Sequence, residues 1–249
     1  MDTAAQYGQQ DFNLPHDVVS LPSKGKFYKN GKSSVKVGYL TAADENTLLG
    51  QRNPDNLIPN LLRSKIYEPN MDINSLLDCD VEAILIFLRN TSFGSEYVFN
   101  LRDPKTLSMF EATVTLDELS VKEPTILPNE NGLFELTLPK SGKKVKCKLL
   151  TIGDTQELTK LQEAYPEGVV APVVTKRLEK HIIEFDGSTD PAEIATAIQV
   201  LPIADSKYIR NTLREAEPRL DLERVFTAPS GEKVSARITF GAEFFRPFF

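Results

Sequence analysis

The feature that most constrains how this 249-residue chain can fold is a match between its two halves. At one constant spacing, charged and apolar positions of the first half recur in the second: Leu76 with Leu201, Asp80 with Asp205, Ile84 with Ile209, Leu88 with Leu213 and Arg89 with Arg214. Within each set the apolar residues fall at helical intervals, so both sets predict an apolar helix face that packs on a core.

Two further segments match in the same order. Leu21–Lys26 corresponds to Leu138–Lys143, and Val35–Asp44 corresponds to Val145–Asp154. The first pair is Leu-Pro followed by a lysine–glycine turn, which is typical of a hairpin, and the second ends in Thr-x-x-Asp, which is typical of a helix start. The sequence therefore predicts an α+β fold of two duplicated halves related by a pseudo-two-fold axis. The alternative is two unrelated α+β stretches with common turn chemistry.

Each half is expected to contain a β-hairpin, short helices and a closing β-hairpin. The expected helices are 42–49, 57–67, 81–89, 151–165, 173–183, 190 onwards and 205–216, with Asp80, Asp190 and Asp205 as caps. The expected organisation is a flexible N-terminal tail over 1–17, a first α+β repeat over 18–120, a linker over 121–132 and a second α+β repeat with a Phe-rich end over 133–249.

Charge and composition exclude several classes of function. The net charge of −6 repels phosphate backbones, and the one dense run of lysines, 140–148, alternates with apolar residues like the solvated face of a half-buried strand. The longest apolar run, 83–88, is too short to cross a bilayer, and the N-terminus has no signal-peptide pattern. Cys79 and Cys147 imply no disulfide framework, which fits a reducing cytosol. No nucleic-acid partner and no membrane span are expected.

The residues that usually carry catalysis do not form a recognisable pattern. His16, His181 and the two cysteines lack the spacing of a zinc site, and no nucleophile–base motif occurs. The acids near predicted helix starts are explained by capping. The chain is therefore expected to be no enzyme and to have no catalytic, cofactor-binding or metal residues and no small-molecule substrate. A carboxylate-based hydrolase, the less favoured alternative, would need two acids that converge in a cleft.

The C-terminus is unusually aromatic. Leaving four phenylalanines in water is unfavourable, at about 25 cal/mol per Å² of apolar surface. Two interpretations are open: the segment packs on its own domain, or it anchors in a partner. The residues predicted to bind a partner are Phe244, Phe245, Arg246, Phe248 and Phe249. Because side chains alternate along an extended segment, Phe245 and Phe249 are the expected anchors, with Phe244 and Phe248 packed at home.

Three segments together resemble a known family. Val19–Tyr28, Val35–Glu45 and the Phe-rich end look like the baseplate hub proteins of contractile-tailed bacteriophages of the T-even type. The resemblance implies a non-enzymatic hub component or hub-assembly factor that contacts other tail and baseplate proteins. It implies a place in the virion tail baseplate, or in the host cytoplasm during assembly, and no catalytic residue, cofactor or metal. A cytosolic scaffold or adaptor unrelated to phage is the alternative.

Overall fold

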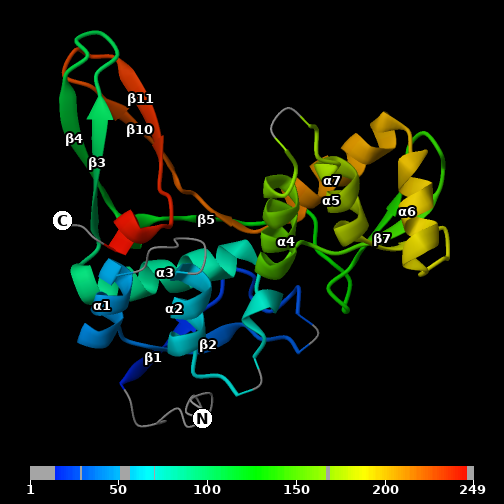
Figure 1. Ribbon diagram of the computed structural model, residues 1–249, viewed down its shortest axis with the longest axis horizontal. Coiled ribbons are helices and arrows are strands. Elements are labelled where there is room, and N and C mark those ends of the chain that lie inside the picture. The colour runs from blue at the N-terminus through cyan, green and yellow to red at the C-terminus, as the bar shows by residue number, and fades with distance from the viewer. Residues whose placement is uncertain (1–14, 29, 51–56, 70, 167–168, 246–249) are drawn as a thin grey trace.

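The computed structural model describes residues 15–28, 30–50, 57–69, 71–166 and 169–245. It is an α+β structure with two lobes and a projecting arm (Figure 1). The first lobe contains β1 (His16–Ser20), β2 (Ser34–Gly38), α1 (Ala42–Gly50), α2 (Leu57–Lys65), η2 (Ile73–Ser75) and α3 (Asp78–Phe93). The second lobe contains β6 (Phe134–Thr137), β7 (Lys144–Cys147), α4 (Ile152–Glu163), α5 (Val173–His181), β8 (Ile182–Phe185), α6 (Pro191–Gln199) and α7 (Ile203–Ala216).

The arm is built from two β-hairpins that are far apart in the sequence. One is β3 (Glu96–Arg102) with β4 (Met109–Thr115), and the other is β10 (Glu223–Thr227) with β11 (Lys233–Arg237). The two hairpins lie side by side and away from both lobes (Figure 1). The rings of Phe99 and Phe226 touch between them, with centroids 5.3 Å apart.

Helix starts follow the predicted chemistry where a threonine stands three residues before an aspartate. At α4 the Thr151 hydroxyl accepts from the Asp154 N–H, and the Asp154 carboxylate accepts from the Thr151 N–H, which is a capping box. Thr41 and Asp44 make the same exchange at α1. The side chain of Asp190 caps α6, with Pro191 at its first position, as predicted.

A second contact also recurs in both halves. The capping-box aspartate of each first helix forms an ion pair with a lysine at the end of the next helix. Asp44 pairs with Lys65, and Asp154 pairs with Lys180 at 3.6 Å. In each half this pair ties together two helices that follow one another in the sequence.

Several predicted helices end or begin differently in the structure: α2 ends at Lys65 rather than at 67, and α7 begins at Ile203 rather than at 205. The helix expected over 173–183 stops at His181, and Ile182–Phe185 forms strand β8 on the edge of a β6-β7-β8 sheet. The β-branched pair Ile182–Ile183 favours a strand once the neighbouring β7 edge is open to it. Helix α3 begins at Asp78 rather than after Asp80, and its N-cap is Leu77.

The boundaries between the parts are less sharp than the sequence suggests. Strand β1 begins at His16, inside the expected tail, and residues 1–14 lie outside the described chain. The expected linker contributes strand β5 (Val121–Lys122), which pairs with β9 (Arg219–Leu220). Each apolar core also contains residues from the other half of the chain. Leu77 and Cys79, from the first half, pack in the second-lobe core. Residues 222, 238, 244 and 245, from the second half, pack in the first-lobe core.

Candidate protein-interaction site

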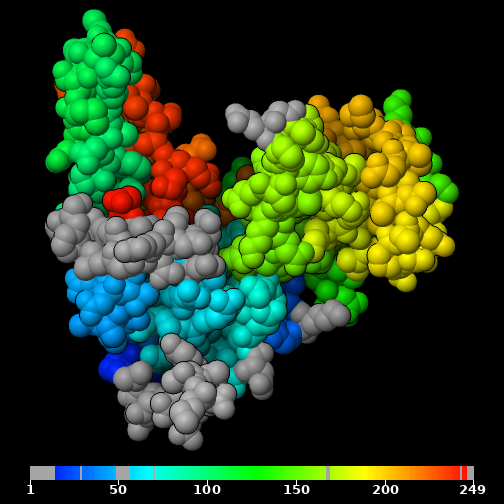
Figure 2. Space-filling model, in the orientation of Figure 1, coloured from blue at the N-terminus to red at the C-terminus, as the bar shows by residue number. Residues whose placement is uncertain are grey.

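The arm is the element best placed to meet another protein. It projects from the body, and a notch separates it from the second lobe (Figure 2). Its inner faces carry apolar residues that belong to or pack against the first-lobe core: Tyr97, Phe99, Leu101, Val114, Phe226 and Ala236. The rings of Phe99 and Phe226 join the two hairpins. The alternation of a two-faced strand then turns every other residue outward.

Several outward residues of the arm are apolar. The side chains of Val98, Leu107, Met109 and Val225 are 47%, 58%, 65% and 62% exposed. Each hairpin is a two-stranded sheet, so each of its two strands has an outer edge without a ladder partner among the described strands. Exposed apolar side chains next to open strand edges are typical of a surface that binds another protein.

A buried aspartate joins the tips of the two hairpins. Asp103 has no exposed surface, and it accepts hydrogen bonds from the N–H groups of Lys105 and Thr106 in its own turn. From the other hairpin it accepts bonds from Ser230, at 2.9 Å from the N–H and 2.7 Å from the hydroxyl. Burial alone would raise the pKa of Asp103, but these donors hold that pKa at about 2. The carboxylate therefore clamps the arm closed.

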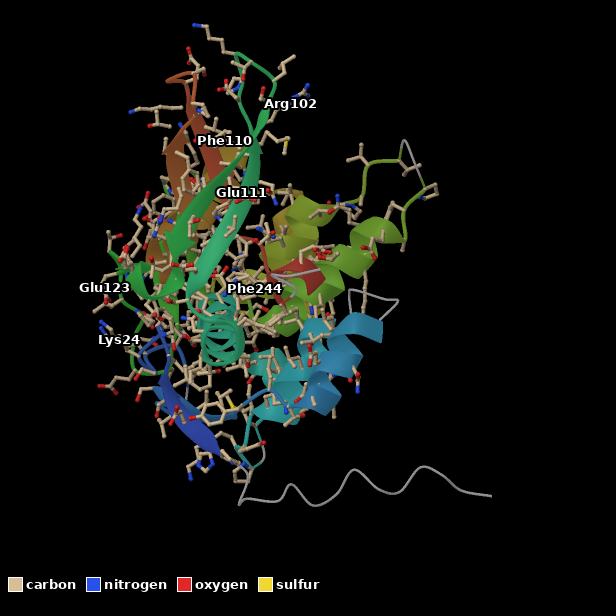
Figure 3. The ribbon with its side chains drawn as sticks, turned by 90° about the vertical axis from the view of Figure 1, so that its left-hand side faces the viewer. Lys24, Arg102, Phe110, Glu111, Glu123 and Phe244 are labelled. Carbon is tan, nitrogen blue, oxygen red and sulfur yellow. The ribbon has the colours of Figure 1, made fainter. Side chains whose placement is uncertain are left out.

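We expect Asp103→Ala to separate the two tips, because it leaves four donors without their acceptor. Amide hydrogen exchange should rise at residues 103–108 and 228–232. Glu111→Ala is the matched control, since Glu111 is exposed on the same arm (Figure 3) and should change nothing. The pKa of Asp103 in the folded chain lies below the ordinary value of 3.8, so its stabilisation of the contact between the tips is fully present above about pH 4. That stabilisation is lost as the pH falls through about 2, where the carboxylate takes up a proton. Unchanged exchange in Asp103→Ala would contradict the clamp.

The base of the arm is held by Arg89, the last buried charge of α3. Its side chain is 1% exposed and donates to the carbonyl oxygens of Phe244 (3.0 Å), Glu96 (2.7 Å) and Gly94. The guanidinium also lies 5.5 Å from the ring centre of Tyr97 and 5.6 Å from that of Phe244. The corresponding Arg214 is exposed. Arg89 thus joins α3, the first hairpin and the C-terminal segment.

Of the four C-terminal phenylalanines, the structure describes Phe244 and Phe245. Phe244 and Phe245, in the short helix η4 (Ala242–Phe245), are 1% and 2% exposed and pack in the first-lobe core (Figure 3). The chain's own core thus covers both rings, as in the own-domain interpretation, and neither is an exposed anchor in this structure. Arg246, Phe248 and Phe249 lie outside the described residues, and their partner role stays a prediction.

Two aspartates that the sequence assigned to helix caps bind hairpin turns instead. Asp80 and Asp205 are fully buried, and each accepts hydrogen bonds from the turn of the hairpin that opens its half. Asp80 accepts from the Ser23 N–H at 2.9 Å and the Tyr28 hydroxyl at 2.5 Å. Asp205 accepts from the N–H groups of Lys140 and Ser141 at 2.7 and 2.9 Å. The capping interpretation was wrong, and the same clamp occurs in both halves.

A cleft of about 570 Å³ lies where α3 meets β9 and the base of the arm. The carboxyl groups of Asp78, Glu82 and Glu217 line it, a convergence that no spacing in the sequence predicts. Burial raises the pKa of all three, that of Glu82 to about 7. An acid–base pair needs one group to stay ionised while the other is protonated. Asp221 and Glu223 also line the cleft, so the lining alone assigns no acid and no base.

The remaining candidate residues have structural roles. His181 is the last residue of α5 and is buried, with Nδ1 at 2.9 Å from the Lys148 carbonyl oxygen. Cys79 and Cys147 are buried free thiols. Among the described residues, no group of three or more His, Cys, Asp or Glu side chains could hold a metal ion. None of the helices in that part of the chain has the length and apolar character needed to span a membrane.

Comparison with known proteins gives one match. A family model described as T4 bacteriophage base plate protein matches residues 15–245, which is nearly the whole chain and includes both lobes and the arm. No curated protein and no solved structure matches the chain.

Proposed function

Because the chain belongs to the T4 bacteriophage base plate protein family, we propose that it acts in the baseplate hub, as a hub component or as a factor that assembles the hub. Membership itself makes it a structural protein of the phage tail baseplate, with protein partners in the tail. The hub assignment rests on the resemblance of Val19–Tyr28 and Val35–Glu45 to hub proteins. The match over 15–245 carries the baseplate role, of which the hub role is the finer part that we propose.

The arm is the element that we propose contacts the neighbouring hub protein. Its exposed apolar side chains, Val98, Met109 and Val225, support this role, because buried apolar anchors carry much of the binding energy of protein interfaces. Arg89 and Asp103 hold the arm at its base and tip, so it can present one fixed surface. A rigid surface loses less entropy on binding than a flexible one.

We also propose that the two halves are a duplicated module. The repeated Asp80 and Asp205 clamps support it, since they join residues 57 and 65 positions apart and do not follow from turn composition alone. An adaptor unrelated to phage is disfavoured by the family match. A carboxylate hydrolase stays the less favoured alternative, because the matched family is one of baseplate proteins.

Complementation of a phage that lacks this gene tests the proposal. Without the protein, tails should lack complete baseplates, and wild-type protein should restore infectious particles. A variant carrying Val98→Asp and Met109→Asp should fold but fail to restore them. Val170→Asp is the matched control, because Val170 is 91% exposed and belongs to the second lobe, between α4 and α5.

Mass spectrometry of purified particles then separates the two forms of the proposal. Presence of the chain in finished tails identifies a hub component, and its absence from infectious particles identifies an assembly factor. Infectious particles made without the protein would contradict a baseplate role. Full complementation by the double variant would contradict the role of the arm alone.

A further inference from the structure

The two lobes join through the starts of two helices. The Ile152 N–H, at the start of α4, donates to the Leu76 carbonyl oxygen at 2.8 Å, and Thr151 forms an antiparallel bridge with Leu77. The approach is so close that a Cβ added at Gly153 would lie 2.9 Å from atoms of Asn74. This joint buries Leu77 just before α3.

The surface that corresponds to the start of α3 in the second half has no such cover. In the alignment of the halves, Pro202 and Ile203 stand where the first half has Leu77 and Asp78. Leu77 is 3% exposed, whereas its counterpart Pro202 is exposed, and Ile203 and Val200 on either side of that position are 82% and 80% exposed. The Leu201 carbonyl oxygen, which corresponds to that of Leu76, has no donor among the described residues. The corner between α6 and α7 is therefore an uncovered apolar surface.

The complementary surface is also free. Thr41, Ala42 and Ala43 correspond to Thr151, Ile152 and Gly153, the residues that make the internal joint, and all three are exposed at the start of α1. α1 lies at one end of the molecule's long axis and the α6–α7 corner at the other (Figure 1). If a pseudo-two-fold axis related the halves, it would map the joint between the starts of α4 and α3 onto a contact between the starts of α1 and α7. Those two starts lie far apart, so the joint does not follow the predicted symmetry.

We propose that the α6–α7 corner of one molecule binds the α1 start of a second copy of this chain, in a head-to-tail contact that repeats the internal joint. The occupant is a second copy because the chain itself carries the surface that matches the corner. The Ala42 N–H would meet the Leu201 carbonyl oxygen, and Ile203 would be buried. The Ala43 methyl, in place of Gly153, sets the two surfaces slightly further apart than the internal joint.

A contact between two different surfaces leaves one of each free on the resulting dimer. Such a heterologous contact extends into a ring if its rotation closes, and into a filament otherwise. This inference rests on the proposed duplication and is independent of whether the protein is a hub component or an assembly factor.

Sedimentation velocity of the full chain over a wide concentration range tests the contact. Wild type should form species larger than a dimer as concentration rises. Ile203→Asp and Ala42→Arg should each stay monomeric, since each lacks one surface. An equal mixture of the two variants should form a dimer and nothing larger, because each variant supplies the surface that the other lacks. Val225→Asp, an exposed apolar residue of the arm, is the control and should associate like wild type.

Loss of association in a variant must be distinguished from loss of its fold. Circular dichroism and thermal unfolding should match wild type for both variants, because Ile203 and Ala42 are exposed. A wild type that stays monomeric at all concentrations would overturn the proposal. So would self-association that survives Ile203→Asp, or a mixture of the two variants that remains monomeric.

Discussion

Replacing Arg89 with alanine should destabilise the chain by about 4 kcal/mol, because three buried carbonyl oxygens lose their donor and a large side chain leaves a cavity. The carbonyls belong to Gly94, Glu96 and Phe244, so the loss affects the base of the arm and the C-terminal segment together. The midpoint of thermal unfolding should fall by roughly 10 °C. Arg89→Lys should recover only part of this, since an ammonium group cannot reproduce the fork of a guanidinium.

The second half supplies the matched control. Arg214 corresponds to Arg89 in the alignment of the halves but is exposed. Arg214→Ala should change stability by less than about 0.5 kcal/mol, as most surface substitutions do. Equal effects of the two substitutions in urea unfolding would contradict the assignment of Arg89 to the base of the arm.

Asp80→Ala should cost about 3 kcal/mol of folding free energy, because a buried carboxylate that accepts from the Ser23 N–H and the Tyr28 hydroxyl disappears. The loop that follows β1 would lose its attachment to α3. Tyr28 is affected further, since its hydroxyl also accepts from the Leu77 N–H at 2.9 Å. Urea denaturation, monitored by circular dichroism, measures the loss.

A double-mutant cycle separates this clamp from general damage to the core. Tyr28→Phe removes the shared hydroxyl. The double variant should therefore lose less folding free energy than the sum of the losses in Asp80→Ala and Tyr28→Phe. Asp205→Ala should be destabilising through its own turn and should add fully to Asp80→Ala, because the two clamps share no partner. Additive effects of Asp80→Ala and Tyr28→Phe would show that the two groups do not act together.

The sequence predicted the elements whose signals are local. The closing hairpins follow from alternating residues around turn dipeptides, and the starts of α1, α4 and α6 follow from capping residues. Asp80 and Asp205 were misassigned for the same reason. A carboxylate within the first turn of a helix looks like a helix-start residue, and its actual donors lie 57 and 65 positions away in the chain.

The arm and the cleft were beyond local patterns. Nothing near Phe99 indicates that it will meet Phe226, and no spacing relates Asp78 and Glu82 to Glu217. The phenylalanines at the C-terminus show the same limit, since composition indicates that their apolar surface must be covered but not by what. The family resemblance gave the class of protein, whereas the arm that we propose as its contact surface came from tertiary structure alone.

The two halves of the arm are made at different times during translation. Its second hairpin, residues 223–237, and the Phe244 carbonyl that Arg89 binds leave the ribosome after the first hairpin and after the whole second lobe. The aromatic face of the first hairpin therefore stays uncovered until residues 223–237 have been made, whereas the β1–β2 hairpin can form as soon as its own residues are free. A chain that stops short of residue 223 would lack half of the arm. Translation itself would thus keep unfinished chains from joining a growing particle.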